Sequence, residues 1–94
     1  MERIEAGMFA RSLAGHDKDK LYLIYQTEGE YVWLTDGRLR PLAKPKKKKC
    51  RHIQMIHRMP ENWNPEKISD DDVRRAIRQY SSESASHKFI KMED

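Results

Sequence analysis

Residues 20–37 read KLYLIYQTEGEYVWLTDG, two runs of aromatic and branched residues separated by a polar turn. Runs of this composition and length are typical of short β-strands. In the first run, Leu21, Leu23 and Tyr25 fall on one face of a strand, and Tyr22 and Ile24 fall on the other. Neither face is polar, so the pattern predicts a strand that is covered on both sides.

Three further runs of similar character flank this pair, at residues 7–13, 38–43 and 51–56. Five short strands predict a mainly β fold, a small five-stranded antiparallel barrel over residues 7–57. Asp36-Gly37 suits a tight hairpin turn, in which both central residues need positive φ, so residues 30–35 are expected to pair with 38–43. Pro41 cannot donate a ladder hydrogen bond, which makes 38–43 an edge strand or one that breaks early.

The second face of the sheet has a candidate cover in residues 68–82, ISDDDVRRAIRQYSS. Ser69 and Asp72 have the spacing of a capping box, and acidic residues fill the first turn. An apolar stripe follows at helical spacing and consists of Val73, Ala76, Ile77 and Tyr80. We therefore expect a helix over about residues 70–80. We therefore expect the chain to divide into two parts. Residues 1–57 form a barrel with a basic loop, and residues 58–94 form a linker anchored by Trp63, the helix and a frayed tail.

Charge is distributed unevenly along the 94 residues, whose net charge is +4. Residues 37–60 carry nine basic residues and no acidic one, so a polyanion is the expected partner. Pro45 favours an extended chain before the lysine run, which we expect to project as an exposed loop. Contacts to the phosphates of a nucleic acid are assigned to Arg38, Arg40, Lys44, Lys46, Lys47, Lys48, Lys49 and Arg51.

The cellular setting follows from what the sequence contains. No apolar run approaches the roughly 20 residues of a membrane span, and the first residues lack the apolar centre of a signal peptide. A single cysteine, Cys50, fits a reducing compartment. We expect a cytoplasmic protein with no membrane partner.

Residues 15–54, GHDKDKLYLIYQTEGEYVWLTDGRLRPLAKPKKKKCRHIQ, resemble the bacterial KOW-motif RNA-binding proteins. That family is itself similar to KOW-containing ribosomal proteins of the archaeal and eukaryotic large subunit. The matching elements are the turn with Gly15, Asp17 and Lys18, the hairpin Thr35-Asp36-Gly37 with Arg40, and Lys44-Pro45-Lys46 leading to Arg51-His52-Ile53. The resemblance implies an SH3-like barrel, no enzymatic activity and RNA binding of a ribosomal kind, with a role in translation.

The resemblance adds Lys18, Lys20 and His52 to the expected RNA contacts. The family usually has glycine where this chain has Asp19. Glycine adopts positive φ freely, whereas aspartate does so at some cost. The turn that carries Lys18 and Lys20 is therefore the part of the match most open to rebuilding.

Some residues of the sequence could in principle serve functions other than RNA binding. Cys50, His52 and His57 do not have the ligand number or spacing of a zinc site, and the acidic residues 70–72 suit helix capping better than metal binding. We expect no catalytic residue, no metal and no cofactor. The four strand aromatics, Tyr22, Tyr25, Tyr31 and Trp33, fit core packing better than base stacking. The alternatives are a protein-interaction module that binds an acidic partner through the basic loop or a partner through the tail helix, and a duplex DNA binder.

Overall fold

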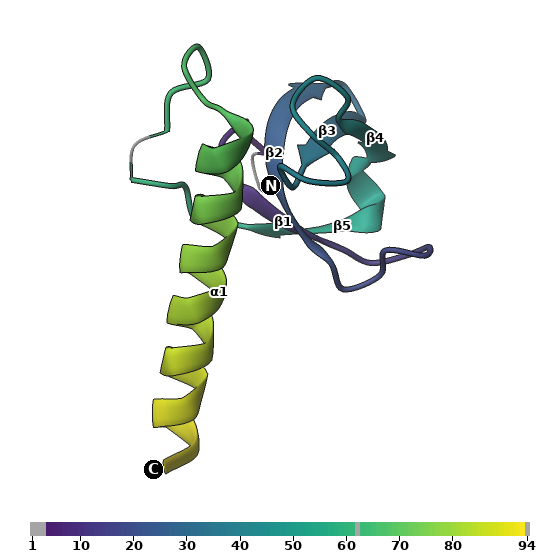
Figure 1. Ribbon diagram of the computed structural model, residues 1–94. Coiled ribbons are helices and arrows are strands. Elements are labelled where there is room, and N and C mark those ends of the chain that lie inside the picture. The colour runs from purple at the N-terminus through teal and green to yellow at the C-terminus, as the bar shows by residue number, and fades with distance from the viewer. Residues whose placement is uncertain (1–3, 62, 94) are drawn as a thin grey trace.

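The chain forms a five-stranded antiparallel sheet with one long helix laid against it (Figure 1), in a computed structural model that describes residues 4–61 and 63–93. A single turn of 3-10 helix lies between the last two strands, at Cys50–His52. The elements are β1 (Phe9–Ser12), β2 (Leu21–Glu28), β3 (Tyr31–Thr35), β4 (Lys46–Lys49), β5 (Ile53–Ile56) and α1 (Asp70–Glu93). The mainly β class with a C-terminal helix is confirmed.

The strands lie in the order β4-β3-β2-β1-β5, and every neighbouring pair is antiparallel. A bulge between Ile24 and Gln26 bends β2, which is the longest strand and the centre of the sheet. Within the described residues β4 and β5 are the two edges, so the sheet is not closed into the barrel that the sequence predicted.

The connection after β3 differs most from the sequence prediction. Residues 38–43 form turns and bends, and the lysine run takes their place as the fourth strand. The Asp36 carboxylate accepts hydrogen bonds from the amides of Arg38 at 2.8 Å and Arg40 at 2.9 Å, and the Asp36 amide donates to the Arg40 carbonyl at 3.0 Å. These bonds fold the segment onto itself as an Asx-type turn, so its backbone is not offered to the ladder.

Gly37 has the positive φ predicted for it, 75°, but it does not close a two-residue hairpin. A Cβ atom at this position would lie 2.5 Å from the Asp70 carbonyl oxygen. Glycine therefore lets the 36–45 connection approach the first turn of α1. The Leu42 amide donates to the Asp70 carboxylate at 2.8 Å, and the Arg74 guanidinium donates to the Gly37 carbonyl.

The first half of β2, residues 21–24, is covered on both faces, as the central run predicted. The inner face carries the buried cluster of Ala10, Tyr22, Ile24, Val32, Leu34 and Ile53. The outer face carries Phe9 and Leu23, which pack with Val73 of α1 and with partly buried neighbours that include Leu21, Trp63 and Ile77. Tyr25 lies at the bulge and belongs to neither cluster.

The start of α1 is confirmed in detail. The Ser69 amide donates to the Asp72 carboxylate at 3.0 Å, and the Asp72 amide donates to the Ser69 hydroxyl at 3.2 Å, which is a reciprocal capping box. Val73 is fully buried, and the ring of Tyr80 stacks on Phe9 with 4.9 Å between centroids. The predicted stripe therefore faces the sheet.

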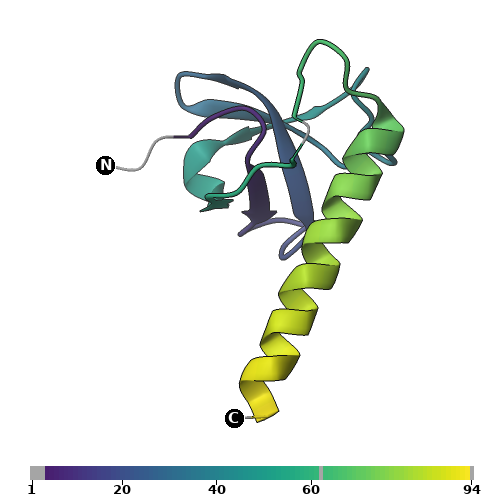
Figure 2. The same cartoon turned by 90° about the vertical axis from the view of Figure 1, so that its left-hand side faces the viewer.

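The predicted end of α1 is wrong, because the helix continues past residue 80 to Glu93. Residues 81–93 contain neither proline nor glycine, the residues that most often stop a helix. Figures 1 and 2 show this second half of α1 extending beyond the sheet.

The linker before the helix is held by Trp63, as the sequence suggested. Its indole lies where a Cβ on Gly7 would stand, with three ring atoms at 2.8–2.9 Å from that position. Trp63 thereby joins the N-terminal segment to the core between sheet and helix. No helix in the described ranges 4–61 and 63–93 is long and apolar enough to cross a membrane.

Candidate nucleic-acid interface

The four lysines at 46–49 form β4, an edge strand, and not the exposed loop expected from the sequence. The strand pairs with β3 in the register Leu34↔Lys46, Trp33↔Lys47, Val32↔Lys48 and Tyr31↔Lys49. Side chains alternate across a strand, so Lys46 and Lys48 share the inner face with the buried Leu34 and Val32. Lys47 and Lys49 share the outer face with Trp33 and Tyr31.

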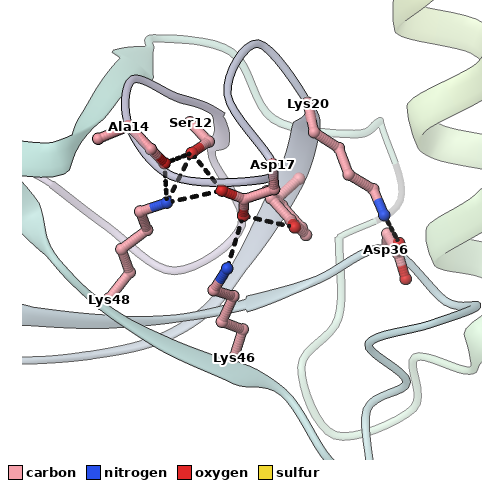
Figure 3. A network of polar contacts seen from close by, with 8 residues as sticks. Ser12, Ala14, Asp17, Lys20, Asp36, Lys46 and Lys48 are labelled. Carbon is pink, nitrogen blue, oxygen red and sulfur yellow. Dashed lines mark hydrogen bonds and ion pairs between the residues drawn. The ribbon is translucent and has the colours of Figure 1, made fainter.

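The two inner lysines converge on one carboxylate (Figure 3). Asp17 Oδ2 accepts from Lys46 Nζ at 2.9 Å, and Asp17 Oδ1 accepts from Lys48 Nζ at 2.9 Å. Lys48 also donates to the Ser12 hydroxyl at 2.6 Å and to the Ala14 carbonyl at 2.9 Å. Only 10% of the Lys48 side chain and 11% of the Asp17 side chain are exposed, so this is a buried ion pair with its hydrogen bonds satisfied.

The same carboxylate holds two neighbouring hydroxyls. The Ser12 hydroxyl donates to Asp17 Oδ1, and the Tyr22 hydroxyl donates to Asp17 Oδ2, both at 2.8 Å. Burial opposes the ionisation of Asp17, but the bonds from the two lysines, the tyrosine and the serine outweigh it and hold the pKa of Asp17 well below its usual range. Burial and the bond to this carboxylate raise the pKa of Tyr22. Lys46 and Lys48 are therefore committed to the fold.

Lys20 is committed in the same way. Its ammonium lies 2.6 Å from Asp36 Oδ2, and the Asp36 side chain is only 8% exposed (Figure 3). Burial opposes ionisation of Asp36, but the Lys20 bond and the two backbone amides lower the pKa of this carboxyl. Of the predicted RNA contacts, Lys20, Lys46 and Lys48 thus have carboxylate partners inside the protein.

Most of the remaining predicted cations lie in two separate regions. Lys47 and Arg51 are exposed and Lys49 is partly exposed, and these three follow one another along β4 and the 3-10 turn. Lys49 and Arg51 also line one shallow hollow, together with Glu30 and Cys50. Within the described part of the chain, none of these three cations forms an ion pair.

The second region lies where the 36–45 connection meets α1. Arg38 lines an open groove there with Arg74 and Arg78 of the helix, and the apolar side chains that line it are Leu21, Leu39 and Ile77. The sequence pattern alone did not connect these helix arginines with Arg38. Their i, i+4 spacing places them on one helix face, which was the available signal. Arg40 is partly exposed and Lys44 exposed in the same connection.

The turn that carries Lys18 keeps the conformation a glycine would have. Asp19 has φ of 73°, and its amide donates to the Ser12 carbonyl at 2.8 Å. Its own carbonyl accepts from Arg11 Nη1 at 2.9 Å. The turn is therefore retained with aspartate in the left-handed region, and Lys18 remains exposed on it.

Two aromatic residues are more exposed than the sequence predicted. Tyr22 is buried in the inner cluster, but Tyr31 and Trp33 are only partly buried and belong to neither core cluster. The Lys47 ammonium lies 4.3 Å from the Tyr31 ring centroid and 5.6 Å from that of Trp33. The alternation of residues 30–35 contained this signal, because Val32 and Leu34 complete the opposite face.

The groups considered for catalysis or metal binding are dispersed. Burial raises the pKa of the Cys50 thiol, which favours the less reactive protonated form. His52 is partly buried in the 3-10 turn, and its carbonyl accepts from the Leu13 amide at 2.9 Å. Among the described residues, no three His, Cys, Asp or Glu side chains are grouped so that they could hold a metal ion.

Comparison with protein-family models and with curated proteins found no match to this chain.

Proposed function

We propose that this protein is a non-catalytic RNA-binding protein that contacts RNA phosphates along its β4 edge. The observation that carries the proposal is the run Lys47, Lys49 and Arg51, which faces solvent along β4 and the following 3-10 turn without an ion-pair partner in the described residues. Cations that have no internal carboxylate can neutralise phosphates without first breaking a bond in the protein. Lys18, Arg38, Arg40, Lys44 and His52 are secondary contacts in this proposal.

The RNA is proposed to be ribosomal, and the fold to be SH3-like, on the strength of the KOW resemblance over residues 15–54. Three features of the chain support the fold assignment. β1 pairs with both β2 and β5, β2 is bent by a bulge, and a 3-10 turn separates β4 from β5. These features support the proposed SH3-like assignment, and the sheet of the described residues keeps two open edges.

Crosslinking in cells, followed by sequencing of the attached RNA, tests this proposal. We expect ribosomal RNA to dominate the crosslinked fragments. Replacing Lys47, Lys49 and Arg51 together with Ser should remove most of the signal, while Lys67→Ser, at an exposed linker lysine, serves as the matched control. Equal recovery of RNA with both variants would contradict phosphate binding along β4.

An acidic protein partner is the second candidate, and the groove beside α1 favours it. Leu39 is 81% exposed, the most exposed of the large apolar side chains described, and it lines the same groove as Arg38, Arg74 and Arg78. A phosphate backbone has no apolar group to pack on an exposed leucine. An acidic protein segment with an apolar residue would contact both the leucine and the arginines. Leu39→Ser should weaken the binding of such a partner and leave the affinity for RNA unchanged.

A further inference from the structure

The outer face of β3 is covered at one end and open at the other. At the covered end, Thr35 is fully buried and pairs with Leu23 of β2. Leu23 in turn packs with Val73 of α1. Trp33 and Tyr31 lie on this same face towards the other end, because side chains two residues apart share a face. In Figure 1, α1 stands on one side of the sheet and β4 on the other. Tyr31 and Trp33 are only partly buried and do not belong to the cluster that α1 covers, so they lie beyond the cover of the helix.

Two lysines complete this open area. Lys47 lies directly opposite Trp33 and Lys49 directly opposite Tyr31, all on the outer face. The Lys47 ammonium lies near both rings, 4.3 Å from the centroid of Tyr31 and 5.6 Å from that of Trp33. We call Tyr31, Trp33, Lys47 and Lys49 the aromatic platform. It joins two partly exposed rings to two ammonium groups on an edge strand.

This combination suits unpaired nucleotides better than a duplex. Side chains two residues apart on a strand are separated by about 6.6 Å along it, a spacing that two successive unstacked bases can match. A base inside a duplex has both of its faces covered by its neighbours, so only an unpaired base can stack on a protein ring. The ammonium groups beside the rings supply the contact to the phosphates.

We propose that the aromatic platform binds two successive unpaired nucleotides of RNA. Their bases stack on Tyr31 and Trp33, and their phosphates contact Lys47 and Lys49. This inference rests on the proposed RNA-binding function and names the kind of RNA that the β4 edge takes. It means that the protein reads a loop, bulge or single-stranded end.

The charges around the platform also indicate on which side of it the RNA backbone lies. Glu28 of β2 lies directly opposite Tyr31 on the other side from Lys49 and is exposed. Its carboxylate repels phosphates, whereas the β4 side offers lysines and continues to Arg51. The sugar-phosphate backbone therefore runs along β4, with the bases pointing towards β3. Lys47 is exposed, so its ammonium can move from the rings to a phosphate when a base stacks.

Fluorescence anisotropy with two labelled RNAs tests the platform. One RNA is a single-stranded octauridylate, and the other is a blunt 12-base-pair duplex. Because each stacked base contributes roughly a 5- to 150-fold change in affinity, we expect Trp33→Leu to weaken binding of the single strand about tenfold. Binding of the duplex should change less than twofold, since phosphate contacts alone hold it.

Trp33→Phe is the matched control, because it keeps a ring at the same place. It should bind the single strand nearly as well as the wild-type chain does. The chain has two tryptophans, so the fluorescence quenching that octauridylate causes in the wild type should disappear in Trp33→Phe, where only Trp63 remains. Quenching that persists in this variant would assign the signal to Trp63 and contradict the platform.

The failure of the platform and the failure of RNA binding have different signatures. If Trp33→Leu affects neither RNA, or both equally, while a Lys47→Ser, Lys49→Ser double variant weakens both, the platform is overturned and phosphate binding stands. If the wild-type chain binds neither RNA in low salt, both proposals are overturned. Circular dichroism of each variant separates a binding effect from unfolding.

Discussion

At the scale of single residues, Asp17 joins three segments of the chain. It bonds Lys46 and Lys48 of β4 and Tyr22 of β2, so one side chain ties the β1–β2 loop to both strands. Removing one member of a buried ion pair typically costs about 3 kcal/mol, because the other charge is left uncompensated. We expect Asp17→Asn to lower the free energy of unfolding by about that amount in urea denaturation. Asp71→Asn, at a carboxylate that is 72% exposed, should change it by less than about 0.5 kcal/mol.

The same carboxylate predicts how stability depends on pH. Its pKa in the folded chain is well below the 3.8 of an ordinary aspartate, so the unfolded state takes up a proton first as the pH falls. The stabilisation is complete above about pH 5 and declines below it, at up to about 1.4 kcal/mol per pH unit for this one group. Urea denaturation between pH 7 and pH 3 should show this decline, and Asp17→Asn should flatten part of it. Parallel curves for the two chains would contradict the assignment.

Asp19 shows how a residue can keep a turn that glycine would form more easily. It has φ of 73°, a region that costs most residues about 1 kcal/mol, although aspartate tolerates it better than most. Asp19→Gly should therefore leave the melting temperature unchanged or raise it slightly. Asp19→Ala should lower the free energy of unfolding by about 1 kcal/mol, because alanine has neither glycine's freedom nor the local polar bonds of aspartate. An alanine variant as stable as the glycine variant would show that the turn is free to rebuild.

At the scale of elements, α1 is part of the core that it covers. Val73 is fully buried between helix and sheet, beside Phe9 and Leu23. Truncating such a side chain leaves a cavity, so Val73→Ala should cost about 2 kcal/mol, which corresponds to roughly 8–16 °C in melting temperature for a domain of this size. Gln79→Ala, at an exposed position of the same helix, should shift it by no more than a few degrees. If Val73→Ala melted at the same temperature as the wild-type chain, the helix would be detached from the sheet in solution.

The elements also show which sequence signals were local enough to be reliable. The capping box needs only Ser69 and Asp72, three residues apart, and its two hydrogen bonds are present. The fourth strand depended on a distant pairing. β3 can accept either of two following segments as its partner, and the self-bonded turn of Asp36 and Arg40 removes the nearer one. Composition favours residues 38–43 over four lysines, so the pattern led to the wrong segment.

At the scale of the whole molecule, charge counted along the chain differs from charge offered to a partner. The sequence indicated nine basic residues in 37–60, but Lys46 and Lys48 are both bonded to Asp17, which lies 29 and 31 residues away. No local pattern carries a pairing over that separation. The two-sided burial of β2 was predictable, because its apolar residues occupy both faces. To predict which lysines face solvent, one would need the register of β4 against β3, which the sequence does not contain.

The most direct measurement of the central claim is the salt dependence of RNA affinity for two double variants of β4. The claim is that Lys47 and Lys49 meet phosphates while Lys46 and Lys48 hold the fold. Lys47→Ser with Lys49→Ser should keep the melting temperature and flatten the slope of log K against log salt by about 1.4 to 1.8, since each lost phosphate contact removes about 0.7 to 0.9. Lys46→Ser with Lys48→Ser should lower the melting temperature markedly and, below that temperature, keep the slope of the wild type. Two folded variants with equally flattened slopes would contradict the division of the strand into structural and RNA-binding lysines.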